Sequence, residues 1–420
     1  MKRNRLKMTG HINDCYEKAI DVLRKNSTHL GFSASNEKHV NYYSVWGRDH
    51  SITAIAAVLT KDAQLIETAK TGLLKLLQYQ ADNGQIPSYI EIENRKKNFG
   101  GLGSITSIDS NMWVVIASAI LYKATKDKRF ITANQEKRYS KVYYHLRSLD
   151  ANACGLLETH LAGDWSDIFN RSYNVLYNQV LYYESLRSLD YLFSEIISNA
   201  KVKNPKTVKM IRFIRRRKRR VKKEVNRKFF FTKNNLQEIK EEYMISSYIT
   251  PEMLQPFYQS HLTPFKHEWV QRFDSLANIL AISTSIAPKE RSLAILSYIK
   301  NHAINEPMIF TALFPPVLET DPDWEPIYAT KEAPYHYHNG GIWPFIAGFY
   351  IASLMKLKKK KLAKKELEKF SLFMKNDSYS FNEYYHGKTL EPLGRPNQAW
   401  SAAGFIIGYV AVKNHYQIFV

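Results

Sequence analysis

Apolar residues recur at helical spacing from one end of the chain to the other. In one long stretch, five of them follow at intervals of three and four residues: Leu176, Val180, Tyr183, Leu186 and Leu189. This spacing places the five side chains on one buried face of a helix. No run of alternating apolar and polar residues convincingly indicates a β-strand. The sequence therefore predicts an all-α fold.

The predicted helices come in pairs that are joined by long polar loops. We expect about a dozen, at residues 11–25, 51–59, 61–80, 108–125, 137–149, 173–197, 205–229, 270–286, 289–301, 341–357, 362–375 and 397–412. Loops are expected at 43–49, 94–106 and 315–334. Antiparallel helices in two concentric rings would form an (α/α)6 toroid whose loops surround a pit. Because no Pro/Gly/Ser-rich linker divides the chain, residues 1–420 are expected to form one domain.

The composition allows a large core and excludes several kinds of protein. The chain has 420 residues, of which 45% are hydrophobic. Its only cysteines, Cys15 and Cys154, exclude a disulfide framework and fit a reducing compartment. The N-terminus lacks the apolar core of a signal peptide, and no run of about 18 apolar residues exists. We therefore expect a cytoplasmic protein without a membrane-spanning helix.

The positive charge of the chain is concentrated in one segment. Residues 201–233 contain sixteen Lys or Arg and one acidic residue, Glu224, and so carry +15 of the net charge of +21. A second basic run covers residues 356–366. Apolar residues between the cations predict an amphipathic helix with a solvated basic side, and a site for a polyanion is the alternative. A nucleic-acid partner is not expected, because no known nucleic-acid-binding module is present.

Six loops beside helix ends share an unusual set of aromatic, acidic, basic and amide residues. They contain Trp46, Arg48, Asp49, Asp109, Trp113, Asp164, Trp165, Asp167, Tyr337, His338, Asn339, Trp343, Glu383, Tyr384, His386, Gln398 and Trp400. Aromatic faces stack on sugar rings, while Asp, Asn, Arg and His bind hydroxyl groups. Each residue alone has an ordinary structural explanation, such as core packing or helix capping. Their recurrence in six loops favours a site for a carbohydrate.

Hydrolysis of a glycosidic bond requires two carboxyl groups across the bond, one protonated and one ionised. The two groups must lie in separate surroundings that move their pKa values apart. Asp167 and Glu383 meet this requirement, because a ring of helices can bring distant loops face to face. Asp164 is the main competitor of Asp167 for the acid. Capping of the following helix is the structural alternative for this acidic pair.

Eight stretches of the chain resemble glycoside hydrolases with an α/α-toroid fold. This group includes bacterial neutral/alkaline invertase-like proteins and amylo-α-1,6-glucosidases, which are glycogen-debranching proteins. The stretches are VWGRDHSITA, QADNGQIPSYI, SIDSNMWVVIASAILYKATKD, GDWSDIFNRSYNVLYNQVLYYESLRSL, RFDSLANILAIS, ALFPPVLETDPDWEPIY, YHNGGIWPFIAGFY and FNEYYHG…QAWSAAGF. They follow the order of the family from Val45 to Phe405. The resemblance implies the toroid fold and its catalytic layout, whereas the substrates of such enzymes differ.

The resemblance also implies roles for the candidate residues. Asp167 would protonate the leaving oxygen as general acid, and Glu383 would activate water as general base, with inversion of the anomeric carbon. Residues that would bind hydroxyl groups are Arg48, Asp49, His338, Asn339 and Gln398. The walls of the sugar site would be Trp46, Trp165 and Trp400. Asp109 and Asp164 complete the candidate substrate-binding set, and core packing remains the alternative for Trp343 and Trp400.

Sucrose is the favoured substrate, because the likeness to invertases is slightly closer along DSNMW and RFDSLANILAI. A 1,6-branched or short α-glucan is the alternative. We expect the carboxyl groups of Asp167 and Glu383 to lie about 6.5–9.5 Å apart, which leaves room for one water. No metal or other cofactor is expected, because the His residues lack the spacing of metal ligands. A toroid that binds sugar without catalysis is disfavoured, since neither carboxylate is missing.

Overall fold

The computed structural model describes residues 10–39, 41–200, 204–246, 249–266, 270–306, 310–415 and 417–419. Within these ranges lie fourteen α-helices and eleven strands of two or three residues each. Short 3₁₀ turns occur at Leu102–Ser104, Lys128–Phe130 and Pro251–Met253. The prediction of an all-α fold is therefore confirmed, with small strands only in the connections.

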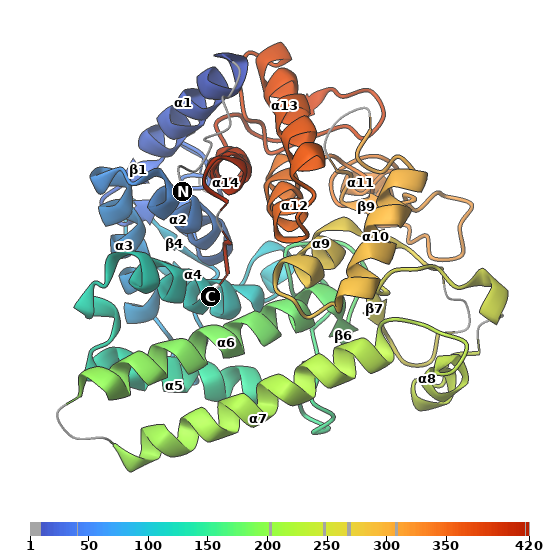
Figure 1. The fold of residues 1–420 in the computed structure, drawn as a ribbon, viewed down its shortest axis with the longest axis horizontal. Helices are drawn as coiled ribbons and strands as arrows, with labels where there is room; N and C mark the ends of the chain where they lie inside the picture. Colours follow the sequence, from blue (N-terminus) through green and yellow to red (C-terminus); the bar gives the residue numbers. More distant parts are fainter. Residues whose placement is uncertain are drawn as a thin grey trace.

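Six helices with mostly buried residues form an inner ring (Figure 1). They are α2 (Gly47–Thr60), α4 (Asp109–Thr125), α6 (Leu176–Asn199), α9 (Ser275–Ser283), α12 (Pro344–Lys356) and α14 (Ala399–Asn414). Each packs against the next in this order, and α14 packs against α2, so the ring is closed. Helices that are apolar on all sides can be buried between neighbours in this way.

Six further helices pack around the inner ring (Figure 1). They are α1 (Gly10–Lys25), α3 (Ala63–Gln78), α5 (Ala133–Ser148), α7 (Pro205–Lys228), α10 (Lys289–Asn301) and α13 (Lys360–Asn376). These outer helices are amphipathic, and α1 buries a single face that includes Ile12, Cys15, Ala19 and Leu23. Each outer helix precedes one inner helix in the chain. The described residues thus form the predicted (α/α)6 toroid of two rings.

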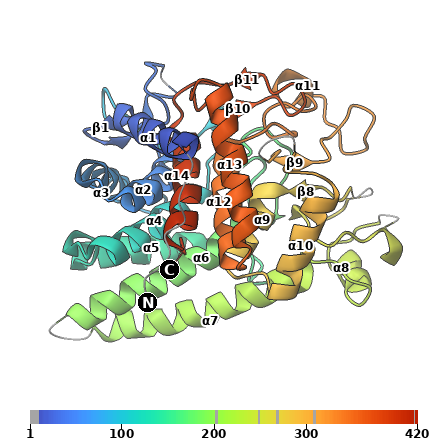
Figure 2. The same cartoon turned by 45° about the horizontal axis from the view of Figure 1, so that its top comes forward.

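The connections differ in length between the two ends of the toroid. All eleven strands lie on connections that lead from an outer to an inner helix. They pair antiparallel as β1 (Ser27–Thr28) with β2 (Gly31–Phe32), β3 (Ser44–Trp46) with β4 (Tyr89–Glu91) and β4 with β5 (Lys97–Asn98), β6 (Asn174–Val175) with β7 (His261–Leu262), β8 (Phe273–Asp274) with β9 (Leu313–Phe314), and β10 (Tyr384–Tyr385) with β11 (Pro392–Leu393). Figure 2 shows β10 and β11 together at one end of the molecule. The N-termini of the inner helices point to this end.

Several helix boundaries differ from those that the spacing of apolar residues predicts. α6 begins at Leu176 and not at 173, because the two preceding residues form β6. α9 begins at Ser275 and not at 270, because Asp274 caps it by accepting a hydrogen bond of 2.9 Å from the Ala277 N–H. The predicted loop 43–49 is wrong in its second half, where Gly47–Asp49 form the first turn of α2.

Two short helices were not predicted from the sequence. α8 (Leu236–Glu242) follows α7, and α11 (Tyr328–Lys331) lies inside the predicted loop 315–334.

Helices α12 and α14 approach each other closely at Gly348 and Gly404. Glycine is required there, because a Cβ atom on Gly348 would overlap the Gly404 carbonyl. No described helix combines the length and hydropathy needed to cross a bilayer.

Candidate active site

A pocket of about 180 Å³ opens at the end of the toroid where the long connections gather. The first turns of α2 and α14 and the loops before α6 and α12 contribute to its walls. Its lining residues are Ala34, Asn41, Tyr42, Trp46, Arg48, Asp49, Tyr89, Gly101, Trp165, Asp167, Lys331, Tyr337, His338, Trp343, Glu383, Gln398 and Trp400. The pocket therefore joins segments from nearly the whole length of the chain.

Nine of the twelve predicted site residues line this one pocket. They are Trp46, Arg48, Asp49, Trp165, Asp167, His338, Glu383, Gln398 and Trp400. The other three, Asp109, Asp164 and Asn339, lie behind the walls and are buried. These three take part in hydrogen-bond networks that hold the lining residues in place.

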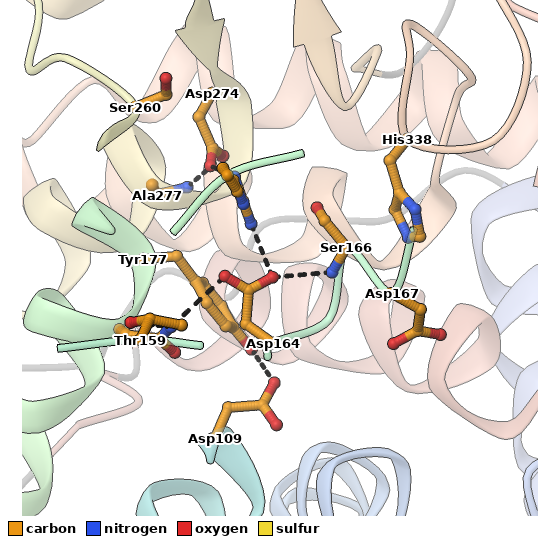
Figure 3. Close-up of polar contacts among 12 residues, drawn as sticks. Asp109, Thr159, Asp164, Ser166, Asp167, Tyr177, Ser260, Asp274, Ala277 and His338 are labelled. Carbon is orange, nitrogen blue, oxygen red and sulfur yellow. Dashed lines mark hydrogen bonds and ion pairs between the residues drawn. The ribbon is translucent and has the colours of Figure 1, made fainter. Parts of the chain in front are cut away.

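Asp164 organises the loop that carries Asp167. Its carboxylate accepts hydrogen bonds from the Ser166 N–H at 2.8 Å, from Arg171 at 2.9 Å and from Asn178 at 3.3 Å (Figure 3). It caps no helix, because α6 begins only at Leu176. Three protein donors thus hold the Asp164 carboxylate outside the pocket lining, where it positions the loop.

Asp109 and Asn339 also bind protein groups. Asp109 accepts hydrogen bonds from the Tyr177 hydroxyl at 2.9 Å and from Arg48 at 3.1 Å. The Asn339 amide oxygen accepts from the Val317 N–H at 2.6 Å, and its NH2 group donates to the carbonyls of Val317 and Glu332. Asn339 therefore fixes the loop before α12, and its side chain is occupied by backbone partners.

Arg48 lies among three carboxylates in the first turn of α2. Its guanidinium nitrogens lie 3.1 Å from Asp109, 3.7 Å from Asp49 and 3.9 Å from Asp167. Burial opposes the charge on Arg48, but these acidic neighbours raise its pKa well above the usual value. The guanidinium group of Arg48, which stays charged, thus faces three carboxyl groups. Acidic groups therefore outnumber the cation in this part of the site.

Asp167 is the acidic residue of its loop that reaches the pocket. Its side chain is 24% exposed and points away from the Asp164 network in Figure 3. Burial raises the pKa of Asp167 to about 7, and the charges of Asp109, Asp164 and Asp49 add to this effect while Arg48 opposes it. A carboxyl group with such a pKa holds a proton in a large fraction of molecules at neutral pH.

Glu383 reaches the same pocket from the segment just before β10. Burial raises the pKa of Glu383 to about 7, with further increases from Asp49 and Asp167. The Tyr42 hydroxyl opposes this shift by donating a hydrogen bond of 2.9 Å to Oε2 of Glu383. Glu383 therefore has a partner that stabilises its ionised form.

Indole rings form much of the pocket wall and pack on one another. The ring centroid of Trp343 lies 5.4 Å from that of Trp165 and 5.5 Å from that of Trp400, and both pairs are nearly perpendicular. The His338 ring stacks on Trp343 at 5.0 Å. Core packing and pocket lining are thus compatible for Trp343 and Trp400. Trp113, in contrast, is fully buried behind the pocket and donates to the Tyr177 hydroxyl.

Five lining residues present buried polar atoms that have no hydrogen-bond partner among the described residues. These atoms are Arg48 Nε, Trp165 Nε1, His338 Nε2, Gln398 Oε1 and Trp400 Nε1. Buried polar atoms are normally hydrogen-bonded, so their concentration around one pocket indicates a polar ligand. Sugar hydroxyls both donate and accept, and they match such a mixed set. Within the described part of the chain, no cluster of His, Cys, Asp or Glu could hold a metal ion.

Several lining residues were given no role from the sequence. Tyr42, Tyr89 and Lys331 were missed entirely, and Tyr337 was noted only as part of its loop. Tyr42 and Tyr89 lie beside or within strands β3 and β4, next to the WGRD segment. The pairing of Tyr89 with Trp46 in the sheet could have identified Tyr89 as a pocket residue. Strands of three residues are too short to be predicted from the alternation of apolar and polar residues, however.

Comparison with known proteins identifies the family of this chain. Residues 14–414 match the family described as alkaline and neutral invertase. The chain belongs to this family. Among its relatives is the probable alkaline/neutral invertase A, chloroplastic, of Arabidopsis thaliana, which is 24% identical over 426 residues. The match covers 89% of this chain and 65% of the relative. Cytosolic invertase 1 of Oryza sativa subsp. japonica is 21% identical, with 92% and 74% covered.

The chain spans about two thirds of the length of the first curated invertase relatives, 65% and 63%. Solved structures share the fold at lower identity. A bacterial glucoamylase complexed with acarbose has a TM-score of 0.66 at 13% identity, covering 97% of this chain and 57% of that one. A mannosylglycerate hydrolase from Thermus thermophilus, in complex with glucose, has a TM-score of 0.64 at 16% identity, covering 94% and 99%. Both likenesses agree with the observed toroid.

Proposed function

We propose that this member of the invertase family is an inverting glycoside hydrolase that cleaves an α-glucosyl bond, with sucrose as the favoured substrate. One observation carries the proposal. Asp167 and Glu383, which are distant in the sequence, line one pocket, and burial raises the pKa of each to about 7. The sequence predicted two pKa values that differ, whereas burial raises both to about 7. Near neutral pH each carboxyl is therefore protonated in part of the molecules, so the state with one acid and one base that hydrolysis of a glycoside needs is populated.

In the proposed reaction Asp167 is the general acid and Glu383 is the general base. Asp167 donates its proton to the glycosidic oxygen as the bond to the anomeric carbon breaks. Glu383 accepts a proton from a water molecule, whose oxygen attacks the same carbon from the opposite face. The Tyr42 hydrogen bond supports this assignment, because it favours the ionised form of Glu383. Solvent exchange then returns the proton from Glu383 to Asp167.

The pocket walls would hold the glucosyl unit. Arg48 and Asp49 would bind hydroxyl groups from the first turn of α2, and Gln398 would do so from the start of α14. Trp46, Trp165 and Trp400 would contact the apolar faces of the ring. The buried atoms without hydrogen-bond partners support this arrangement, since a bound sugar would satisfy them.

Family membership supports sucrose over an α-1,6-linked glucan, because the curated relatives are named as invertases. We further propose that residues 1–420 form one domain. Action in the cytoplasm is also proposed, and the rice relative named as cytosolic supports it. Other relatives are named as chloroplastic or mitochondrial.

The test is a product-release assay on sucrose, isomaltose, panose and maltotriose with the full chain. We expect glucose and fructose from sucrose, and no comparable release from the three glucans. Release from isomaltose or panose alone would replace sucrose by an α-1,6 substrate. Inactivity on all four sugars would contradict the hydrolase proposal.

Two substitutions connect the activity to the pocket. Asp167→Asn and Glu383→Gln are each expected to lower kcat by about 10²–10⁴-fold, the usual contribution of a general acid or base. The thermal unfolding temperature serves as the control for folding. Near-normal kcat in folded Asp167→Asn, together with loss in Asp164→Asn, would move the acid to Asp164.

A further inference from the structure

Helix α7 carries cations that differ in their surroundings. Those on its flanks are bound by acidic residues of the toroid: Arg215 and Lys218 lie 2.8 and 2.9 Å from Asp190, and Arg217 pairs with Asp150. At its C-terminal end Lys228 pairs with Glu242. These flank cations attach α7 to its neighbours, and the acidic partners offset most of their charge.

A second set of cations faces solvent along the length of the helix. It consists of Lys209, Arg212, Arg216, Arg219 and Lys223, which we call the basic row. All five residues are exposed, and none has an acidic partner among the residues that the structure describes. Their spacing of three or four residues puts them on one side of α7 over about 21 Å.

The basic row cannot turn inward. The opposite side of α7 buries Met210, Ile211, Ile214, Val221 and Val225 against the toroid. Figures 1 and 2 show α7 as a straight helix along the outer edge of the molecule. The row is thus a line of five positive charges along an outer edge of the molecule. Like charges at this spacing repel one another, so an anionic partner would lower the energy of the row.

We propose that the basic row docks the protein on an anionic lipid bilayer. A straight helix at an edge can lie along a plane, so that all five cations reach headgroups at the same time. Polybasic surfaces of this kind bind anionic bilayers through summed electrostatic attraction. Phe213, which is 42% exposed beside the row, adds an aromatic ring that suits the interfacial region. This inference is independent of the proposed hydrolysis.

The geometry favours a bilayer over a nucleic acid. The major groove of duplex DNA is about 12 Å wide and a helix with its side chains is about 10–12 Å across, so a helix that enters the groove must have free flanks. Both flanks of α7 are occupied by contacts to Asp150, Asp190 and Ser285. Proteins that bind single strands combine a positive groove with several aromatic stacking platforms, whereas this row is a ridge with one exposed Phe.

The experiment is co-sedimentation of the full chain with vesicles of phosphatidylcholine alone and with about one third phosphatidylserine. We expect binding only to the anionic vesicles, and loss of binding at about 1 M salt, where the screening length falls to about 3 Å. The test variant replaces Lys209, Arg212, Arg216, Arg219 and Lys223 by Gln. It is expected to lower the partition coefficient at least about tenfold, with no loss in the thermal unfolding temperature.

A matched control removes the same number of charges from the second basic run. Lys358, Lys359, Lys360, Lys361 and Lys365 are exposed around the start of α13. Their replacement by Gln is expected to leave vesicle binding within about twofold of the unmodified chain. An equal loss in both variants would show a general charge effect and would overturn the proposal. So would absence of binding to anionic vesicles, or tighter binding to duplex DNA or single-stranded RNA than to the vesicles.

Discussion

The hydroxyl of Tyr42 donates a hydrogen bond of 2.9 Å to Oε2 of Glu383, although 341 positions separate the two residues in the chain. Tyr42 lies just before β3, and Glu383 lies just before β10. The bond favours the ionised form of Glu383, while burial and the charges of Asp49 and Asp167 favour the protonated form. Tyr42 is thus a positioning residue that holds the proposed base and moderates its pKa.

Replacement of Tyr42 by Phe is expected to raise the pKa of Glu383, because a hydrogen bond to the carboxylate is lost. A general base works only when ionised, so the acidic limb of the pH profile of kcat/KM moves to higher pH. We expect a loss of about 10-fold in kcat/KM at neutral pH, as removal of a hydrogen bond to a charged group of about 1.5 kcal/mol predicts.

Tyr89→Phe is the matched control for Tyr42→Phe. Tyr89 lines the same pocket and packs against Trp46 at a centroid distance of 4.5 Å. This control is expected to leave the acidic limb in place. A shift of equal size in both variants would assign the effect to the general polarity of the pocket.

The pair Asp167 and Glu383 is expected to give a bell-shaped pH profile of kcat/KM with its maximum near neutral pH. Burial raises the pKa of each carboxyl to about 7. Below this range the base is protonated, and above it the acid has lost its proton, so the rate falls on both sides. The apparent pKa values belong to the interacting pair. A flat profile between pH 5 and 9 (about two units on either side of the pKa values) would contradict acid–base catalysis by these groups.

Asp164 and Asp167 are expected to differ in their effect on stability. Asp164→Asn leaves Arg171, which also binds Asp274, with an incomplete set of buried acceptors. We expect a loss of about 3–5 kcal/mol in the free energy of unfolding, as for a broken buried ion pair. Asp167→Asn removes a charge that burial disfavours, so its unfolding temperature should stay within about 3 °C or rise. Chemical denaturation of both variants and thermal unfolding of Asp167→Asn measure the contrast.

The scaffold follows from local features of the sequence. α12 and α14 are apolar on every side, so they have to be enclosed by other helices. α1 and α7 are apolar on one side only, which places them outside. The start of α9 was harder to predict from the sequence. Strand β8 and the Asp274 cap occupy the positions where the apolar spacing predicts the first turn of the helix. Short strands form through distant partners, and these cannot be read locally.

The functions of neighbouring acidic residues were harder to separate. Asp164 and Asp167 lie in one loop beside Trp165, and the local sequence does not distinguish which of the two reaches the pocket as the general acid. The decisive difference is Arg171 with its second partner Asp274, a contact across 103 positions of the chain. Asn339 likewise lies next to the pocket residue His338, but Val317 and Glu332 occupy its amide. Hydrogen bonds between buried residues that are distant in the sequence can be identified only in the folded structure.

The separation of the two carboxyl groups links the geometry to the stereochemistry of the product. We expect the carboxyls of Asp167 and Glu383 to lie about 6.5–9.5 Å apart in a crystal structure of the chain, so that one water fits between Glu383 and the anomeric carbon. Attack from the opposite face then releases β-glucose first from an α-glucosyl substrate. Proton NMR of the early anomeric signal of glucose measures this outcome before mutarotation. Early α-glucose, together with a carboxyl separation near 5 Å, would indicate a covalent intermediate on Glu383 and a retaining mechanism.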